Sequence, residues 1–503
     1  MPAALQPDST AMPHSPLPPS PVPALTPELI ERFAAIVGAR HALTDPADQA
    51  PYLKDWRDLY AARTQLVLRP ATTDEVAAIL RLASETRTRV VPQGGATGLV
   101  GGHLPFAEGG EIIVSLTRMK AVRAVDPAGN TLIAEAGVTL QEAQDAAAAV
   151  GRLFPLNIGS KGSCTIGGNL ATNAGGTQAV AYGLARDQVL GLEVVLADGR
   201  IWHGLRTLKK DNTGYDLKHL FIGAEGTLGI ITAASLKLVA APRAIEAAWI
   251  GLASPAAALA LLARAQERAG QAVTGFELMP RNLFEFVLRH MPGARDPLAE
   301  PAPWYCLVEL ASPAAAGLRD MLEDVLAAAH EDGLVIDAAI AESTAQREAF
   351  WRWREGMSEM QKPEGGSIKH DVSVPVAAVP AFIAEAVAAC EALIPGCRPV
   401  PFGHLGDGNI HFNVSQPVGA DKDWFLAHYD EVNGLVHGIV ARFGGSISAE
   451  HGIGRMKRDL LPAVKDPVEL QLMHSLKALL DPQGILNPGK VLPMTGPGTA
   501  NGP

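Results

Sequence analysis

The segment NIGSKGSCTIGGN at residues 157–169, which continues into TNAGG at 172–176, decides the fold. Seven glycines lie within residues 159–183, and hydroxyl and amide side chains stand between them. A solvated linker of this composition would be rich in charge, whereas Ile166 and Leu170 predict a packed segment. Packed backbone must satisfy its N–H groups, and glycine lets a ligand approach them closely. The segment therefore predicts a site for an anionic ligand.

A second glycine-rich loop, PQGGATGLVGG at residues 92–102, follows a predicted strand at 89–92. A Rossmann loop needs G-x-G-x-x-G at the start of a helix, but His103-Leu104-Pro105 does not continue as one. A Walker A loop needs Gly-Lys-Ser/Thr, which is absent here. Taken alone, this loop is equally compatible with a plain turn. A third segment, GAEGTLGIIT at 223–232, again places glycine beside an apolar strand, which indicates backbone close to a ligand.

Composition limits the class of protein. A chain of 503 residues predicts several domains, and its net charge of −11 argues against a nucleic-acid partner. The four cysteines form neither a disulfide framework nor a CxxC pair, which is typical of reduced thiols in the cytoplasm. We find no apolar run of the roughly 18–20 residues that a membrane span needs. We therefore expect a cytoplasmic protein without a transmembrane segment, with contact to the inner face of a membrane as the alternative.

Periodicity predicts an α+β fold with a boundary near residue 240. We expect a disordered Pro-rich tail at 1–27, one domain at 28–240, a second at 241–493 with an antiparallel sheet, and a disordered tail at 494–503. The expected elements are a helix at 73–86 capped by Thr73 or Asp74, strands at 111–116, 131–136 and 189–197, then helices at 255–269 and 314–329 with strands at 304–310 and 334–339.

A cluster of histidines and carboxylates lies near the C-terminus. In GHLGDGNIHFNV at 403–414, His411 and Asn413 alternate with apolar residues and so share one face of a strand. His404 precedes them, and Glu450 follows in AEHGIG at 449–454. Two histidines and a carboxylate can hold a divalent metal with an open coordination position. The alternative is a set of hydrogen-bonded polar residues that line a cleft.

With its three glycine-rich segments in order, the region from Leu66 to Val239 resembles the FAD-binding domain of the vanillyl-alcohol oxidase / p-cresol methylhydroxylase superfamily. The resemblance implies two α+β subdomains with FAD extended between them. Some members tether FAD through a histidine after the glycine pair, where this chain has Ala96, so we expect non-covalent FAD. The residues implied are Pro92, Gly94, Gly95, Thr97 and Gly98 around the pyrophosphate, Gly159, Ser160, Gly162, Ser163, Gly168 and Asn169 along the flavin, and Gly226 and Ile230 near the adenine or ribityl side.

The second half is similar to the C-terminal domain of the D-lactate dehydrogenase / D-2-hydroxyglutarate dehydrogenase / glycolate oxidase branch. The two motifs at 403–414 and 449–454 carry this resemblance, together with DPQGILNPGKV at 481–491. It implies a C-terminal segment that returns to the flavin. The site it implies has zinc at His404, His411 and Glu450, a catalytic base at His451, Asn487 and Lys490 near the flavin, and Arg354, Ser358, Lys369 and Asn413 as substrate ligands.

The expected activity is oxidation of a D-2-hydroxy acid by hydride transfer to flavin N5. Arginine and lysine beside a hydroxyl suit a dicarboxylate, which favours D-2-hydroxyglutarate over D-lactate. The alternative interpretation of Arg354 is an arginine that is exposed to solvent on the surface of a helix. Two further hypotheses are an oxidase of sugars, phenols or glycolate, and an FAD-binding subunit without chemistry of its own. The acceptor is an electron-transfer flavoprotein, a cytochrome or a quinone, and a homodimer is a weak expectation.

Overall fold

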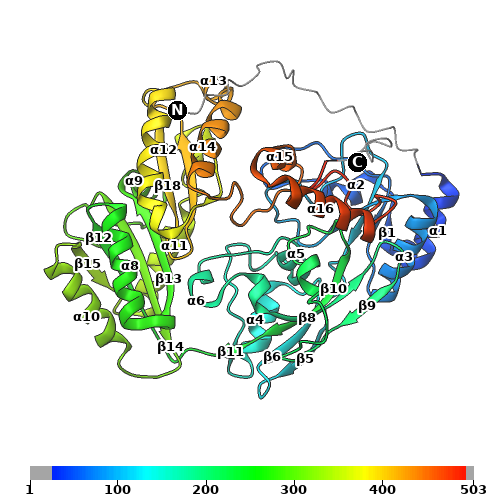
Figure 1. Cartoon of the computed structure of the whole chain (residues 1–503), viewed down its shortest axis with the longest axis horizontal. Helices are drawn as coiled ribbons and strands as arrows, with labels where there is room; N and C mark the ends of the chain where they lie inside the picture. Colours follow the sequence, from blue (N-terminus) through cyan, green and yellow to red (C-terminus); the bar gives the residue numbers. More distant parts are fainter. Residues whose placement is uncertain (1–24, 494–503) are drawn as a thin grey trace, which may run out of the picture.

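A computed structural model describes residues 25–493 (Figure 1). The expected tails at residues 1–24 and 494–503 lie outside this range. Residues 25–27, which we expected in the first tail, belong to the fold. Leu25 is buried, and helix α1 (Pro27–Val37) begins at Pro27 after Thr26, whose side chain accepts a hydrogen bond from the backbone of Leu29. Threonine followed by proline is a strong start signal for a helix.

The first half of the chain contains two main sheets that are separate from each other. In the first, β2, β4 and β3 are parallel and β1 joins antiparallel at the edge, with helix α3 (Thr73–Thr86) packed against it. The expected helix is confirmed, but its cap is Thr72, which binds the backbone N–H of Glu75. The strands are β1 (Ala42–Leu43), β2 (Val67–Leu68), β3 (Arg89–Gln93) and β4 (Glu111–Ser115).

The second sheet is antiparallel and has five strands in the order β5-β6-β10-β8-β9. Helices α4 (Leu140–Ala148) and α5 (Ile166–Ala171) pack against it and share its apolar core. A small sheet pairs β7 (Arg152–Leu153) with β11 (Val239–Ala240). The five strands are β5 (Val122–Asp126), β6 (Thr131–Glu135), β8 (Val189–Val195), β9 (Ile201–Gly204) and β10 (Ile230–Lys237).

The second half is built on a large antiparallel sheet, as the sequence predicts. Its strand order is β15-β12-β14-β13-β18-β19-β16, with β17 also paired to β19. The strands are β12 (Ala244–Leu252), β13 (Val273–Pro280), β14 (Trp304–Ser312), β15 (Val335–Ile340), β16 (Ser367–Ile368), β17 (Val372–Ser373), β18 (Arg398–His404) and β19 (Asn409–Ser415).

Helices cover both faces of this sheet. One face packs against α8 (Pro255–Ala269), α10 (Leu318–Glu331), α12 (Val379–Leu393) and α14 (Tyr429–Arg442). The other packs against α9 (Arg281–His290) and α11 (Thr344–Gly356), where Trp249, Phe284, Phe350 and Trp353 stack around one another. Because residues alternate along a strand, the second face also carries the polar residues of the site described below.

The sequence analysis found no apolar run long enough for a membrane span, but the helical run at residues 376–393 has the length and hydropathy that such a span needs. Within the described chain it is the single helix long and apolar enough to cross a membrane, with a mean hydropathy of 1.8 over 18 residues. Its buried side chains, such as Phe382 and Ile383, pack against the large sheet, and its exposed positions are mostly alanine. The core helix of a soluble protein can have the same length and hydropathy, so this run is weak evidence for a membrane span.

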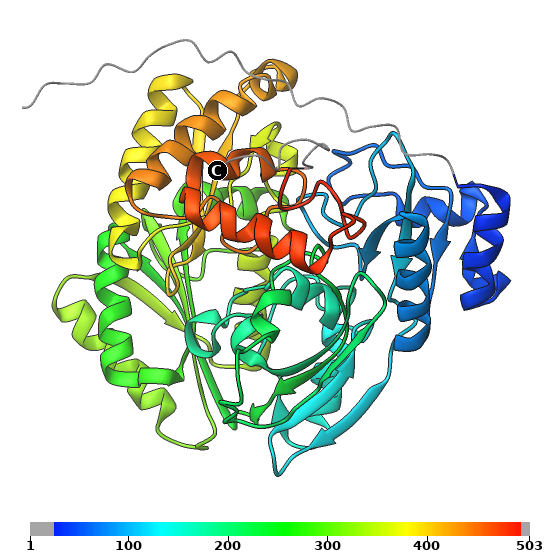
Figure 2. The ribbon, with the colours of Figure 1, turned by 45° about the vertical axis from the view of Figure 1, so that its right-hand side comes forward.

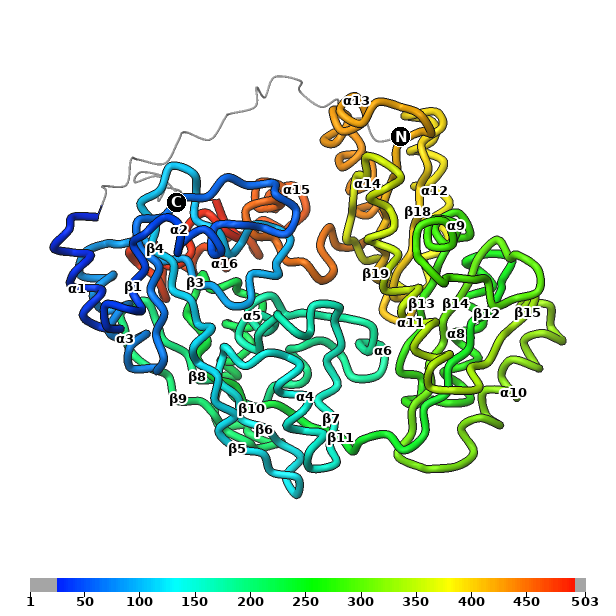
Figure 3. Tube along the Cα trace, turned by 180° about the vertical axis from the view of Figure 1, so that it is seen from behind, coloured from blue at the N-terminus to red at the C-terminus, as the bar shows by residue number. Residues whose placement is uncertain are grey.

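The last segment of the chain crosses back to the first half (Figures 2 and 3). Helix α16 (Pro467–Leu480) leads into a stretch that lies beside β3, where Val90 exchanges two backbone hydrogen bonds of 2.8 Å with Ile485 and Asn487. The loop at 452–454 is held to the third glycine segment, because Glu225 accepts from the backbone of Ile453 at 2.7 Å and Gly454 at 2.9 Å. These contacts bring the C-terminal motifs to the glycine loops.

Candidate functional site

A deep cleft lies between the two sheets of the first half. It encloses a cavity of about 140 Å³ and opens to solvent along part of its length. The glycine loops that line it pack directly on each other: a Cβ on Gly95 would lie 1.9 Å from the carbonyl oxygen of Ser163, and one on Gly94 would lie 2.4 Å from Thr165 Oγ1. These two glycines are therefore required for loop-to-loop contact as well as for access to backbone amides.

Most of the predicted cofactor residues line this cleft. They are Pro92, Gly94, Gly95, Thr97, Gly98, Gly168, Asn169, Gly226 and Ile230. Gly159, Ser160, Gly162 and Ser163 lie outside the lining, and no atom lies within 4 Å of a Cβ built on Gly159 or Gly162. A role for these four in flavin binding stays a prediction.

Two features fit an extended dinucleotide: Ala96 belongs to the lining, and Asn487 lies outside the lining but binds two lining residues. Ala96 has a φ of 55°, a left-handed conformation that is uncommon for alanine and is often found at ligand sites. Asn487, at 1% exposure, donates to the carbonyls of Gly102 and Glu225, while its Oδ1 has no hydrogen-bond partner among the described residues. A buried acceptor without a donor is costly unless a ligand supplies one. The lining thus fits FAD.

The predicted metal ligands come together where the large sheet faces the first half. His404 ends β18 and His411 lies on β19, with ring centroids 5.5 Å apart. His404 Nε2 is 3.6 Å from Glu450 Oε1, and ligand atoms of all three residues lie within 4.8 Å of one another. Burial raises the pKa of Glu450 to about 7 and lowers that of His411 well below its usual value. Burial alone would lower the pKa of His404, but Glu277 and Glu450 raise it to about 9.

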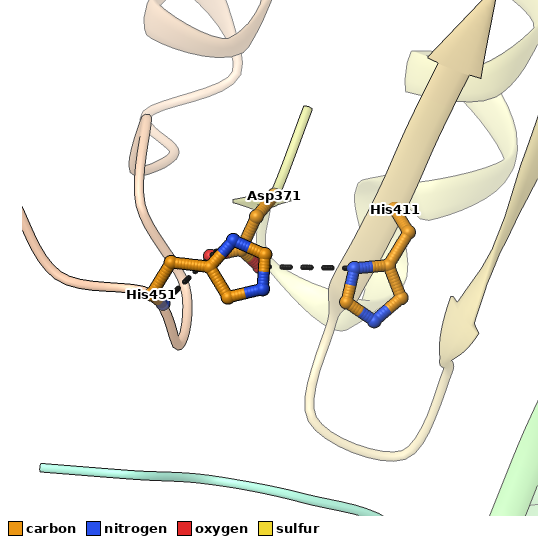
Figure 4. Close-up of side chains that lie close together, drawn as sticks. All are labelled: Asp371, His411 and His451. Carbon is orange, nitrogen blue, oxygen red and sulfur yellow. Dashed lines mark hydrogen bonds and ion pairs between the residues drawn. The ribbon is translucent and has the colours of Figure 1, made fainter. Parts of the chain in front are cut away.

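Asp371 links His411 to the predicted base His451 (Figure 4). Its Oδ2 lies 3.4 Å from His451 Nδ1, and its Oδ1 lies 3.9 Å from His411 Nδ1. The carboxylate also accepts from the backbone of Glu450 and His451 and from the Asn409 side chain. Burial lowers the pKa of His451 to about 4 despite Asp371, so its ring is neutral at pH 7 and can accept a proton.

The described residues offer two sets that could hold a metal, and both include His411. One adds His404 and Glu450, and the other adds Asp371 and His451. Asp371 already accepts three hydrogen bonds, which occupy much of its acceptor capacity. Within the described part of the chain, the Glu450 carboxylate has no comparable set of three donors. Two imidazoles with one carboxylate also suit a divalent metal with an open coordination position. The chemistry of the donors therefore fits the first set better.

The predicted substrate residues occupy one side of this cluster. Arg354 is buried at 6% exposure, which excludes the solvated interpretation, and its guanidinium lies over the ring of Phe402. Ser358 is exposed, and Lys369 donates to its backbone carbonyl at 3.3 Å. Burial, followed by nearby Arg57, lowers the pKa of Lys369 to about 8. Asn413 donates to Gln361 at 3.0 Å, so part of its hydrogen-bonding capacity is used within the chain.

Comparisons with known proteins show the family of the chain. Residues 64–204 match the FAD binding domain family, and residues 241–491 match the family of FAD linked oxidases, C-terminal domain. The D-2-hydroxyglutarate dehydrogenase of Xanthomonas citri pv. viticola is 38% identical over 460 residues, which cover 90% of this chain and 95% of that protein. The chain belongs to the FAD-linked oxidases. The α+β fold and the flavoenzyme class predicted from the sequence are thereby confirmed.

Other members of the FAD-linked oxidases extend the comparison. The mitochondrial D-2-hydroxyglutarate dehydrogenase of Arabidopsis thaliana is 38% identical over 464 residues, covering 92% of this chain and 81% of that protein. The crystal structure of p-cresol methylhydroxylase with substrate bound aligns with a TM-score of 0.69 at 15% identity, covering 93% of this chain and 96% of that one. At that identity the second comparison supports the fold alone.

Sequence reasoning missed three carboxylates that organise the site. Asp371 follows Lys369 closely in the sequence, but we assigned it no role. Glu225 stands between glycines in the third segment and adopts a φ of 51°. Glu277 is the one charged residue in the strand VTGFELMP at 273–280. A lone carboxylate in an apolar strand is the signal that could have found it, because a buried charge needs partners.

Proposed function

We propose that this chain oxidises a D-2-hydroxy acid, with D-2-hydroxyglutarate converted to 2-oxoglutarate as the favoured reaction. One observation carries the proposal: His451 lines the predicted FAD cleft and also lies beside the metal-binding cluster, with its ring 6.1 Å from that of His411. A proton acceptor at that junction can serve a substrate held between metal and flavin. The curated relatives named D-2-hydroxyglutarate dehydrogenase support the same substrate.

Each residue has a defined part in this mechanism. His451 accepts the hydroxyl proton of the substrate. Asp371 accepts a hydrogen bond from the backbone N–H of His451 and lies 3.4 Å from its Nδ1. When bound, FAD supplies the acceptor for the Cα hydride. A divalent ion at His404, His411 and Glu450 would lower the pKa of the substrate hydroxyl. We propose zinc there, because histidine nitrogen and carboxylate oxygen are its usual ligands.

The surroundings of Arg354 favour a carboxylate ligand. Its Nε and Nη2 both pair with one oxygen of Glu277, which leaves the opposite edge of the guanidinium for a ligand. Lys369 adds a second cation, and among residues 25–493 its ammonium has one partner within hydrogen-bond distance, the neutral carbonyl of Ser358. Two cations of this kind match the two carboxylates of 2-hydroxyglutarate better than the single carboxylate of lactate.

Anaerobic bleaching of the flavin by a panel of hydroxy acids tests the substrate. We expect D-2-hydroxyglutarate to bleach the flavin at lower concentration than D-lactate, D-malate, glycolate or L-2-hydroxyglutarate. Lys369→Met should raise the half-bleaching concentration of D-2-hydroxyglutarate about tenfold or more, since an ionic hydrogen bond contributes about 1.5–3 kcal/mol, and leave that of D-lactate nearly unchanged. Equal effects on both acids would contradict the dicarboxylate assignment. Hydrogen peroxide formation in air would indicate an oxidase instead.

We also propose that the FAD is bound without a covalent link. Ala96 lines the cleft after the glycine pair and offers no nucleophile. His103 lines the same cleft, so it is the position to test. After acid precipitation, we expect the yellow colour to stay in the supernatant for both the wild type and His103→Ala. Colour in the wild-type pellet that disappears in His103→Ala would identify His103 as a tether and overturn the prediction.

The electron acceptor and compartment stay predictions. An electron-transfer flavoprotein, a cytochrome and a quinone each suit a flavin dehydrogenase, and the cytoplasm is the predicted location. The homodimer is likewise a prediction.

A further inference from the structure

Glu277 is a fully buried carboxylate in the middle of the large sheet. It lies on β13, and its relative exposure is 0%. Its neighbours Phe276 and Leu278 face the core beneath α8, so Glu277 faces the opposite side, toward α11. Removing a carboxylate from water costs several kcal/mol unless partners replace the lost hydration. The contacts of Glu277 must therefore replace that hydration.

Its two oxygens bind two residues to which we have already given different roles. Oε1 accepts from His404 Nδ1 at 2.7 Å. Oε2 accepts from Arg354 Nε at 2.8 Å and lies 2.6 Å from Arg354 Nη2. His404 is directly opposite on the neighbouring strand β18, whereas Arg354 comes from α11. One side chain thus joins the metal cluster to the carboxylate-binding side.

The contact with His404 determines which nitrogen can bind a metal. An imidazole that donates its Nδ1–H to a carboxylate can bind a metal only through Nε2, which gives up its proton to the ion, and this nitrogen lies 3.6 Å from Glu450. Carboxylate partners of this kind orient metal-binding histidines and raise their basicity, and their loss commonly lowers metal affinity 10–100-fold.

The contact with Arg354 determines how its guanidinium is presented. The Nε edge is occupied by Glu277, and the planar group rests on Phe402 with 4.9 Å between the guanidinium carbon and the ring centroid. The guanidinium has five N–H donors, so hydrogens at both Nη atoms remain available to a ligand. Because Glu277 pairs with Nε and Nη2 along one edge, a substrate carboxylate would meet the guanidinium at its other edge.

We infer that Glu277 is a positioning residue that aligns the metal ligand His404 and the substrate anchor Arg354 through one carboxylate. This inference rests on the proposed function, because it assigns Glu277 to the same site. Removing the charge is therefore expected to weaken metal binding and substrate binding together, although Glu277 touches neither ligand.

Glu277→Gln is the test, since the amide keeps the volume but cannot accept from both partners as a carboxylate does. Metal-stripped, flavin-loaded protein is titrated with Zn²⁺ against a chelator, with His404→Ala as the baseline. We expect the Zn²⁺ affinity to fall 10–100-fold. The concentration of D-2-hydroxyglutarate that half-bleaches the flavin should rise about tenfold. Glu277→Asp, which keeps the charge on a shorter stem, should give intermediate values for both.

Glu193→Gln is the matched control. Glu193 is also a buried carboxylate, held by Thr73, Thr232 and Arg123, but it lies in the second sheet of the first half. Its loss should lower the thermal midpoint without changing either affinity.

The outcomes separate this inference from the proposal on which it rests. Wild-type affinities in Glu277→Gln, or equal losses of affinity in Glu193→Gln, would overturn the positioning role. A wild type that binds Zn²⁺ no better than His404→Ala would overturn the metal assignment. The bleaching titration alone would then test whether Glu277 positions Arg354. If no hydroxy acid bleaches the wild type, the proposed function fails, and this inference fails with it.

Discussion

His451→Ala is expected to slow flavin reduction by about 10²–10⁴-fold, the range that a positioned proton acceptor contributes. His451 lines the cleft, its ring is neutral at pH 7, and its Nδ1 lies 3.4 Å from Asp371. Without the imidazole, the hydroxyl proton would have to pass to water, which is a weaker base than a neutral histidine. Rapid mixing with D-2-hydroxyglutarate, followed by the loss of flavin absorbance, measures the rate directly and needs no electron acceptor.

The control is a histidine of the same domain outside the site. His330 ends α10 and contacts the backbone carbonyl of Val335, so His330→Ala removes an imidazole without touching the cleft. Both variants should retain a full complement of FAD. A His451→Ala enzyme within tenfold of the wild-type rate would show that another group accepts the proton. A wild type whose flavin no hydroxy acid reduces would support a subunit that binds FAD without its own chemistry.

Removal of the metal is expected to have the second large effect. A chelator should lower turnover by about 10²-fold or more, because a Lewis acid contributes several kcal/mol to the stabilisation of the developing charge. Added Zn²⁺ should restore the activity, and the visible spectrum of the flavin should remain that of bound FAD throughout. His404→Ala should reproduce the loss without being restored by Zn²⁺.

Two matched variants, one in each possible set of metal ligands, show which set binds the ion. Glu450→Gln should abolish Zn²⁺ binding if the metal lies between His404, His411 and Glu450. Asp371→Asn should leave much of the Zn²⁺ affinity in place and slow flavin reduction through His451 instead. If Asp371→Asn removes the metal and Glu450→Gln does not, the ion belongs to the other set. Activity that survives both chelation and His404→Ala would mean that the cluster is a polar lining.

Much of the fold was accessible from local patterns. The helix expected at 255–269 is α8 with the same bounds, and the strand expected at 304–310 extends by two residues as β14. Alternation placed His411 and Asn413 on one face, and β19 confirms it. The helix expected at 314–329 begins later, at Leu318, because Gly317 in a left-handed conformation precedes it. Where periodicity and turn chemistry agree, the local sequence was sufficient to predict the type of element and its bounds.

The parts that local patterns missed depend on contacts between distant residues. Glu277 and His404 are 127 positions apart, and Glu225 and Gly454 are 229 apart, so no spacing rule connects them. The resemblance supplied candidate ligands, but it did not show that Gly94 and Gly95 are required by the neighbouring loop, nor that Arg354 is buried against a carboxylate. Such facts depend on which surfaces meet in three dimensions.

The stretch Ile485–Asn487 beside β3 has a consequence for the order of synthesis. Every residue from β3 to Lys490 must leave the ribosome before the sheet of β3 gains its neighbour at 485–487 and the buried Lys490 reaches Glu111, 3.3 Å away. The nascent first half therefore keeps an open sheet edge while the second half is made. Domains commonly fold one after another during translation, but here the flavin-binding half is completed by residues that follow the large sheet in the sequence.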